Sequence, residues 1–515
     1  MAPRNKYVFF SLVFAVISYT LFFTRLSVLK YMSFFSFAPD DLAISNNILW
    51  HTSRGHFLFQ SIGERFLDFH FGFFYIVVSL FYKLYPHIFS LFVLEHFALA
   101  LGIMPVYYIL KQRFNSKPVA LLFGFSYLLF NPLHYFSFVD RDILTGFSIT
   151  FLLFSFYFFG NRLSGFIIFS LLAMMSKEEA GFVVCMFGLY AFLKKKGLKW
   201  KVVPVAIGIS YFILIWCFIA PLLNYDPSNN PYIWNFFGSN PNKYSFQELT
   251  AHNFMAITDR LFSFRHFVSL VKFIGFPFNI FCLFAPAILL ISLPTIIAAQ
   301  LSVEKYFVSL ESVHHLVFLV PFAFLSSLFG LSRILNLLYK IKFVARSVPV
   351  KILPWIAAVL FLTFNIYSNL GKNIHLPAGG EYRDIDISDT RFIRGKNMYS
   401  SIFYTQDRKD QVAWEFIKLI PKDKSVSTSD TYLPVLSSRD KVYHFGTKKE
   451  INDRDGHDLE AEYVFLNKNN DYLGFGGREV SHKQISEKAR LLLNRNYTVI
   501  KEDENFILLK KSYHE

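Results

Sequence analysis

The sequence has little charge and almost no cysteine. Only 17% of its 515 residues are charged, whereas soluble domains usually carry about 25%. The three cysteines, Cys185, Cys217 and Cys282, lie inside apolar runs, so neither a disulfide framework nor a cysteine-based metal site is expected. A nucleotide-binding glycine loop is also missing. Gly474-Phe475-Gly476-Gly477 lacks the helix and the acidic residue that should follow, and we interpret it as a turn.

Long apolar runs fill most of the first 370 residues. The chain is 53% hydrophobic and contains 65 Phe residues, which suits lipid-facing helices better than one soluble core. A bilayer core of roughly 30 Å needs about 20 apolar residues per helix. The first run has no small-residue cleavage site, so we interpret it as an uncleaved spanning helix. The sequence predicts about eleven spans, at residues 7–27, 88–110, 118–137, 143–160, 163–177, 180–194, 202–222, 265–281, 283–300, 315–337 and 352–370.

Basic residues gather in the loops on one predicted side of the membrane. With the amino terminus in the cytoplasm, the loops on that side contain Lys and Arg but no Asp or Glu. The positive-inside rule favours this orientation. The formal net charge of +15 is therefore a topology signal, and we do not expect nucleic acid as a partner. The basic residues are Arg4, Lys6, Lys111, Arg113, Lys117, Arg162, Lys194, Lys195, Lys196, Lys199, Lys201, Arg333, Lys340, Lys342, Arg346 and Lys351.

The residues after Asn369 form a second predicted domain. An odd number of spans places residues 371–515 outside the cytoplasm, beyond a membrane domain of residues 1–370. This tail is mixed in charge and rich in Gly, Asp and Asn. Its pattern of apolar residues predicts short strands and amphipathic helices, and hence a small α/β domain. The expected strands are 425–429, 442–445, 463–466 and 497–500, and the expected helices are 411–419 and 481–493.

Carboxylates and imidazoles gather on the face opposite the basic loops. The first outer loop, residues 28–87, is long, and separate outer loops each contribute ionisable side chains. A membrane-embedded site needs such groups as bases or metal ligands, together with cations that hold an anionic phosphate. The residues are Asp40, Asp41, Glu64, Asp68 and His70 in the first loop, Asp140, Arg141 and Asp142 in the second, Lys177, Glu178 and Glu179 in the third, and Glu311, His314 and His315 between the ninth and tenth spans.

These residues also have structural explanations. Outer loops of membrane proteins are polar in general, and an Asp beside Pro39 can cap the helix that follows. Glu64 is more typical of a solvated loop. For Glu95 and His96, inside the second span, we expect helix packing or a hydrogen bond between helices rather than catalysis.

Several short motifs resemble a bacterial family of predicted membrane proteins of unknown function. They are Asp41-Leu42-Ala43-Ile44 with Asn47 and Trp50, His70-Phe71, Lys177-Glu178-Glu179-Ala180-Gly181, Ile420-Pro421-Lys422-Asp423-Lys424-Ser425-Val426-Ser427, and Leu436-Ser437-Ser438-Arg439. The match therefore runs over most of the chain. Where that family usually continues its His-Phe with Ser-Pro, this chain has Gly72-Phe73. Where it often has His-Pro-Asp in the second loop, this chain has Asp140-Arg141-Asp142.

That family resembles in turn the GT-C superfamily of glycosyltransferases, which includes protein mannosyltransferases and aminoarabinose transferases. The resemblance implies an all-α, GT-C-like polytopic bundle in the inner (cytoplasmic) membrane, with an extracytoplasmic α/β tail. Those enzymes take a sugar from a polyprenyl-phosphate donor on the non-cytoplasmic side. Their signature acid in the first outer loop falls here on Asp40-Asp41.

The expected reaction assigns a role to each candidate residue. Asp41, or Asp40 in its place, would accept the proton of the acceptor, and Lys177 and Arg141 would stabilise the leaving phosphate. The sugar hydroxyls or a divalent cation would be bound by His70, Asp140, Asp142, Glu178 and His315. The donor sugar, the acceptor and the need for metal stay open. Two other classes also stay open: a transporter or lipid flippase, which would more often show two related halves, and a catalytically inactive membrane scaffold.

Overall fold

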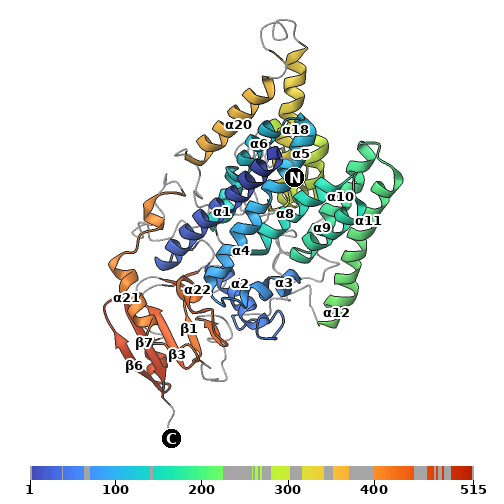
Figure 1. Ribbon diagram of the computed structural model, residues 1–515. Coiled ribbons are helices and arrows are strands. Elements are labelled where there is room, and N and C mark those ends of the chain that lie inside the picture. The colour runs from blue at the N-terminus through green and yellow to red at the C-terminus, as the bar shows by residue number, and fades with distance from the viewer. Residues whose placement is uncertain are drawn as a thin grey trace.

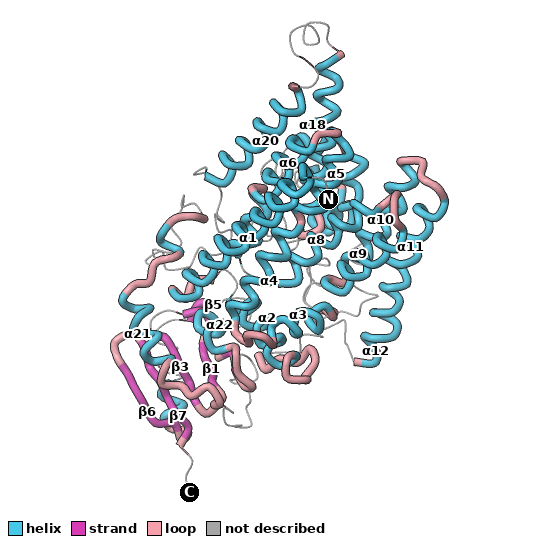
Figure 2. The backbone as a smooth tube through the Cα atoms, viewed as in Figure 1, coloured by secondary structure: helices cyan, strands magenta, loops and turns pink. Residues whose placement is uncertain are grey.

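Helices make up most of the structure, and a sheet lies near the carboxyl terminus (Figures 1 and 2). The computed structural model describes residues 3–36, 39–62, 70–139, 143–223, 280–301, 316–340, 352–370, 398–445, 461–468, 471–473, 478–480 and 489–512, with isolated positions between 258 and 268 and at 349.

The apolar helices match the expected spans. Within the described residues, 6 helices are long and apolar enough to cross a membrane, and shorter apolar helices accompany them. The long helices are Lys6–Met32, Ile88–Phe114, Lys117–Val139, Leu198–Leu222, Leu319–Tyr339 and Leu353–Leu370. The shorter ones are Ile143–Phe158, Leu163–Ser176, Ala180–Leu193 and Pro286–Leu301. The span expected at 265–281 lies largely outside the described residues.

Several of these spans are divided into shorter elements. α4 and α5 meet at Gly102, where a Cβ would collide with the ring of Tyr127, so glycine lets Tyr127 pack against this junction. In chain order the elements are α1 (Pro3–Met32), α4 (Ile88–Leu101), α5 (Ile103–Phe114), α6 (Lys117–Leu128), α7 (Asn131–Val139), α8 (Ile143–Phe158), α9 (Leu163–Ser176), α10 (Ala180–Leu193), α11 (Leu198–Ile213), the π-helix η2 (Leu214–Ile219), α12 (Ala220–Leu222), η5 (Ile280–Phe284), α16 (Pro286–Leu289), η6 (Leu290–Ser292), α17 (Leu293–Leu301), α18 (Leu319–Tyr339) and α20 (Leu353–Leu370).

The outer helices expose large apolar side chains. Phe14 in α1 is 72% exposed, Phe218 in η2 is 59% exposed and Leu360 in α20 is 64% exposed. Soluble monomers rarely expose large contiguous apolar patches, so these faces suit contact with lipid chains. The opposite faces of the helices pack into one large buried cluster that extends from Leu12 to Phe361 and on to Phe403.

The basic loops lie together at one end of the bundle. Lys196 lies against Gly160, and the charges of Arg333 and Arg113 act on Lys194. Figure 1 shows the α10–α11 connection and the carboxyl end of α18 at the upper end, whereas α2 (Pro39–Thr52), α3 (Phe74–Tyr82) and the sheet lie at the lower end. The separation of basic loops from the tail agrees with the sequence pattern.

The tail contains a five-stranded sheet in the order β2-β1-β3-β7-β6. β1 pairs in parallel with β2 and β3, and β7 pairs antiparallel with β3 and β6. The strands are β1 (Val426–Thr428), β2 (Val442–His444), β3 (Tyr463–Asn467), β6 (Tyr497–Glu502) and β7 (Phe506–Lys511), with a separate antiparallel pair of β4 (Asp471–Leu473) and β5 (Arg478–Val480). The helices are α21 (Arg408–Ile417) and the short α22 (Leu433–Leu436).

The expected strands of the tail are confirmed, but a strand between two others in the sheet was missed. β1, β2, β3 and β6 lie at the four expected positions. β7 was not expected, although its first residues, Phe506 to Leu509, are all buried. The helix expected at 411–419 starts earlier, at Arg408, because Asp407 and Asp410 form a capping box there. Of the helix expected at 481–493, residues 489–493 are helical and 481–488 lie outside the described residues, as do Gly474 to Gly477.

The tail docks directly onto the end of α1 and onto α2. α1 continues to Met32, past the expected start of the loop, and its last carbonyl oxygen accepts hydrogen bonds from Gln406 and Trp414. Phe34, Ala43 and Ile62 belong to the same buried cluster as the core of the tail. The first outer loop and the tail therefore share one hydrophobic core.

Candidate functional site

The two acidic residues of the first outer loop lie in the first turn of α2. The helix begins at Pro39, so Asp40 and Asp41 are inside its first turn rather than at the capping position before it. Negative charge is favourable there because the unpaired N–H groups of a helix start carry partial positive charge. Both side chains are half-buried, so the helix start presents two carboxylates that remain partly accessible.

The remainder of α2 is held on two sides by buried polar side chains. Asn46 donates to the hydroxyl oxygens of Ser437 at 2.7 Å and Ser438 at 2.9 Å, and accepts from Tyr82 at 2.8 Å. Ser45, one turn after Asp41, shares a hydrogen bond of 2.9 Å with Tyr75 in α3. The orientation of the acidic first turn is therefore fixed by both α3 and the tail.

His70 and Glu178 form a close pair across two loops. Their Nδ1 and Oε1 atoms are 3.2 Å apart, and the second carboxylate oxygen of Glu178 accepts from the backbone N–H of Phe71 at 3.3 Å. The Glu178 side chain is only 10% exposed, whereas that of His70 is 32% exposed. Burial alone would lower the pKa of His70, but the hydrogen bond and charge of Glu178 raise it. Burial likewise opposes the charge of Glu178, and His70 nevertheless lowers the pKa of this carboxyl.

Glu179 and Lys177 complete this cluster. One ligand atom each from His70, Glu178 and Glu179 lies within 4.8 Å of the other two. Desolvation of its carboxyl group and the charge of Glu178 raise the pKa of Glu179, although the residue as a whole is exposed. Lys177 acts electrostatically on all three groups, so the loop between α9 and α10 places a cation beside two carboxylates.

The cluster is held in place by close packing of α10 against α11. A Cβ at Gly208 would lie 2.5 Å from the carbonyl oxygen of Gly181, and the Cys185 thiol donates to the carbonyl oxygen of Val205 at 3.7 Å. Small residues allow membrane helices to approach this closely. On the other side, Phe71 is buried and packs edge-on against Trp216 of η2, with ring centroids 5.7 Å apart. The loop that contains Glu178 and the segment that contains His70 are therefore both supported by the same span, Leu198–Leu222.

α3 connects the two groups of ionisable residues. Its start follows His70 by a few residues, and it packs against both α2 and α9. Asp40, Asp41, His70, Lys177 and Glu178 consequently lie on the tail side of the bundle. Four further candidates, Asp140, Arg141, Asp142 and His315, lie outside the described residues. Glu64 and Asp68, Glu311 and His314 also lie outside them.

Two buried polar residues of the second span lie between helices. His96 in α4 shares a hydrogen bond of 3.0 Å with the Ser27 hydroxyl of α1, which confirms the expected bond between helices for His96. Glu95 is also buried, with 2% exposure. Both residues contribute to helix packing, and neither belongs to the cluster around His70.

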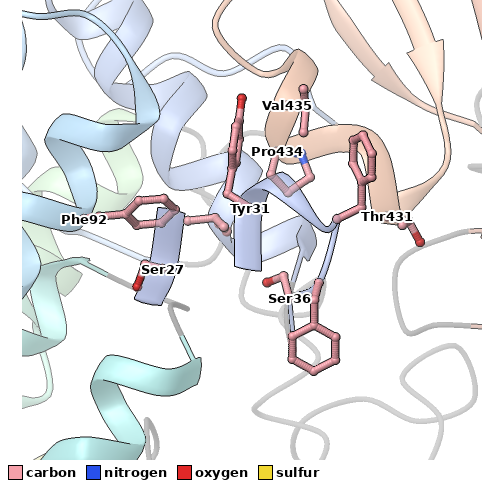
Figure 3. Close-up of a pocket in the computed structure, with 10 residues that line it drawn as sticks. Ser27, Tyr31, Ser36, Phe92, Thr431, Pro434 and Val435 are labelled. Carbon is pink, nitrogen blue, oxygen red and sulfur yellow. The ribbon is translucent and has the colours of Figure 1, made fainter. Parts of the chain in front are cut away.

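A small cavity lies between the end of α1 and the tail (Figure 3). Ser27, Tyr31 and Phe92 line it from the membrane domain, and Thr431 and Pro434 line it from the tail. Its described lining contains no carboxylate, imidazole or basic group. Leu42, the neighbour of Asp41, also lines the cavity.

Both a protein-family model and a solved structure match this chain over nearly its whole length. A family model described as "Predicted membrane protein (DUF2079)" matches residues 30–508. No curated protein matches the chain. Among solved structures, the chain is similar to ArnT from Cupriavidus metallidurans in the apo state, with 12% identity and a TM-score of 0.41, over 96% of this chain and 98% of that chain. The family match includes α2, the Lys177-Glu178-Glu179 loop and the sheet up to Leu508.

Proposed function

The chain belongs to the DUF2079 family of predicted membrane proteins, and we propose that it is a membrane glycosyltransferase. In this proposal it transfers a sugar from a polyprenyl-phosphate donor to an acceptor on the non-cytoplasmic face. The observation that carries the proposal is the arrangement of the tail-side end of the bundle. Two partly accessible carboxylates start α2, and a half-buried His70–Glu178 pair beside Lys177 lies across α3 from them. The basic loops lie at the opposite end.

The proposed reaction needs a group that accepts a proton from the acceptor. Its hydroxyl or amine attacks the anomeric carbon, the bond to the phosphate oxygen breaks, and the acceptor loses one proton. We assign that proton to Asp41, with Asp40 as the alternative, because a carboxylate within hydrogen-bond reach supplies such catalysis. Both carboxylates lie in the first turn of α2, and the Ser45–Tyr75 hydrogen bond attaches the next turn of this helix to α3.

The leaving polyprenyl phosphate needs positive charge where its own negative charge develops. Lys177 is the described cation beside the cluster, and Arg141, outside the described residues, is the second one that we propose. The lipid chain would lie along α11 and η2, whose outer faces expose Phe212 and Phe218. Phe71 joins that helix face to the cluster by packing on Trp216.

A transporter or flippase would also contain interrupted helices near the middle of the membrane. The segment from Ile280 to Leu301 is interrupted in this way by 3-10 turns. However, Ser326 donates to the carbonyl oxygens of Cys282 and Ala285 at 2.7 and 2.9 Å, and the segment contains no charged residue. The interruption is therefore satisfied by packing and does not support an ion-binding site.

The test compares Asp41→Asn with wild type in cells that lack the endogenous protein. Loss of the protein should remove a glycan, detected by mass spectrometry of envelope glycoconjugates, and wild type should restore it. Because loss of a general base costs about 10² to 10⁴-fold in rate, Asp41→Asn should fail to restore it while accumulating normally in the membrane. Glu504→Gln, at an exposed carboxylate of the β6–β7 turn, serves as the control and should restore the glycan. Full restoration by Asp41→Asn and by Asp40→Asn would reject the assignment.

A further inference from the structure

The His70 cluster has the composition and spacing of a metal site. It offers one imidazole nitrogen and two carboxylates, with ligand atoms within 4.8 Å of one another. Zinc binds nitrogen and oxygen ligands at about 2.0–2.2 Å, so two ligands of one tetrahedral ion lie about 3.3 Å apart. His70 Nδ1 and Glu178 Oε1 are already 3.2 Å apart. The ligand atom of Glu179 lies within 4.8 Å of both of them.

A buried hydroxyl without a partner lies next to this cluster. Tyr211 of α11 is 8% exposed, and its hydroxyl has no hydrogen-bond partner among the described residues. The antiparallel packing of α10 and α11 brings Gly208 against Gly181. Tyr211 follows the first glycine by three residues and Glu178 precedes the second by three, so this packing brings the two residues to the same end of the helix pair. An electrostatic interaction between Glu178 and Tyr211 agrees with this placement.

We propose that His70, Glu178 and Glu179 bind one divalent transition-metal ion and that Tyr211 orders the outer side of this site. A ligand set with one imidazole and two carboxylates favours Zn²⁺, with Mn²⁺ as the competing ion. The Tyr211 hydroxyl donates a hydrogen bond to Glu178 or to a water on the ion. Groups that hold a metal ligand in this way usually contribute to the affinity of the site.

The alternative is an ion pair that needs no metal. In that case His70⁺ neutralises Glu178, but the Glu179 carboxylate remains next to Glu178, and like charges at this distance repel each other. A divalent cation neutralises both carboxylates and gives Tyr211 a polar neighbour of fixed geometry. With Lys177 beside it, the ion would also attract an anionic phosphate, a role that rests on the proposed function, whereas metal binding itself does not.

The test measures metal binding directly on the full-length protein in detergent after treatment with a chelator. Equilibrium dialysis against Zn²⁺, and separately against Mn²⁺, is followed by elemental analysis of the bound metal. Wild type should retain one equivalent of Zn²⁺. Loss of a residue that merely supports a ligand costs about 10–100-fold in affinity, so His70→Gln and Glu179→Gln should each weaken binding by at least about 100-fold. Tyr211→Phe should weaken it by about 10-fold.

His56→Gln is the matched control, because His56 is an exposed histidine of the same outer loop. It should bind as wild type does. Glu179 is the most exposed of the three ligands, so Glu179→Gln tests the site without removing the buried His70–Glu178 pair. Wild type that retains no metal, or Glu179→Gln and His70→Gln variants that bind normally, would overturn the proposal. Binding of Mn²⁺ but not Zn²⁺ would overturn the choice of ion. If the protein binds the metal but transfers no sugar, the metal site is supported and the proposed glycosyltransferase function is rejected.

Discussion

The side-chain amide of Asn47 donates to the backbone carbonyl oxygen of Ser437 at 2.9 Å. This contact joins α2 of the membrane domain to a turn of the tail far along the chain. The same amide also donates to the carbonyl oxygen of Arg439 at 3.1 Å, and its oxygen accepts from the backbone N–H of Ser61 at 2.8 Å. Nearby, the Trp50 indole donates to Asp440 at 3.1 Å. The helix that starts with Asp40 and Asp41 is thus fixed to the tail.

Replacing Asn47 should loosen this docking while leaving the fold of the tail intact. Asn47→Ala leaves the Ser437 and Arg439 carbonyl oxygens and the Ser61 N–H without their partner. Each buried polar group that loses its partner costs about 1–3 kcal/mol. Asn47→Asp keeps the acceptor for Ser61 but faces the two carbonyls with a negative charge, so it should be at least as disruptive.

Hydrogen exchange of residues 433–444 measures the docking. Exchange should accelerate in both Asn47 variants, whereas the strands β3 and β7 should stay protected. Asn161→Ala is the control, because Asn161 is exposed and its side chain donates to the carbonyl oxygen of Tyr157 within its own turn. Unchanged exchange in Asn47→Asp would show that the tail is held without this hydrogen bond.

Acid should weaken the same contact through His51. Burial lowers the pKa of this α2 histidine, and the neighbouring Arg54 and His56 lower it further, although the Asp440 carboxylate acts in the opposite direction. A released His51 takes up its proton near pH 6.5, whereas the docked one does so only at lower pH. Neutral His51 therefore makes its full contribution to the free energy of docking above about pH 6.5, and this contribution is lost as the pH falls below that value.

Proteolytic release of the tail at a series of pH values measures this effect. Release from wild type should increase between about pH 7 and pH 5. His51→Gln cannot be protonated and should show a weaker pH dependence. His56→Gln removes only one of the lesser causes of the lowered His51 pKa, so it should keep most of the wild-type dependence. His87 and His444 remain in every variant, so the comparison isolates His51. An identical pH profile for wild type and His51→Gln would contradict the prediction.

The sequence predicted the positions of the described apolar helices, but it did not predict which residues they pack against. Apolar length predicts a span wherever the residues are uniform, as in Leu198–Leu222, because lipid imposes that pattern on each helix by itself. Tyr211 lies inside that run and was missed, since its position opposite Glu178 depends on the packing of α10 against α11. The proximity of His70 to Glu178 likewise depends on tertiary structure, although both residues were candidates from their loops.

The local sequence pattern also failed to predict strand β7 of the tail and the role of α2 in binding the tail. Strand β7 contains a short apolar run, Phe506 to Leu509, followed directly by two lysines, and its burial depends on β3 and β6 on its two sides. Asn47 and Trp50 were noted as part of a family motif beside the acidic pair. The structure shows that they bind the tail, because their partners come from residues 437–440.

Enlarging Gly208 should disturb the cluster from a distance. A methyl group there would lie 2.5 Å from both the Gly181 carbonyl oxygen and the Cys185 sulfur, so α10 and α11 must separate. Overpacking of this kind typically costs about 1–3 kcal/mol. Gly208→Ala should therefore lower the thermal unfolding temperature in detergent. Gly197→Ala is the matched control, since a Cβ at Gly197 meets nothing within 4 Å. Equal unfolding temperatures for the two variants would mean that the helices are not packed this closely.

The membrane orientation is the last prediction, and the proposed site on the outer face depends on it. The start of α11, which contains Lys199, and α21, which contains Glu415, lie at opposite ends of the bundle (Figure 1). The positive-inside rule assigns the basic end to the cytoplasm. In a background that lacks Cys185, Cys217 and Cys282, Glu415→Cys should react with a membrane-impermeant maleimide on intact spheroplasts. Lys199→Cys should react only after the membrane is permeabilised. Both positions are exposed, so poor access does not explain a failure to label. If Lys199→Cys alone reacts on intact spheroplasts, the orientation of the protein is the reverse of the predicted one. Asp41, His70 and Glu178 would then face the cytoplasm. Labelling of both positions from one side would contradict the separation of the two ends by the membrane.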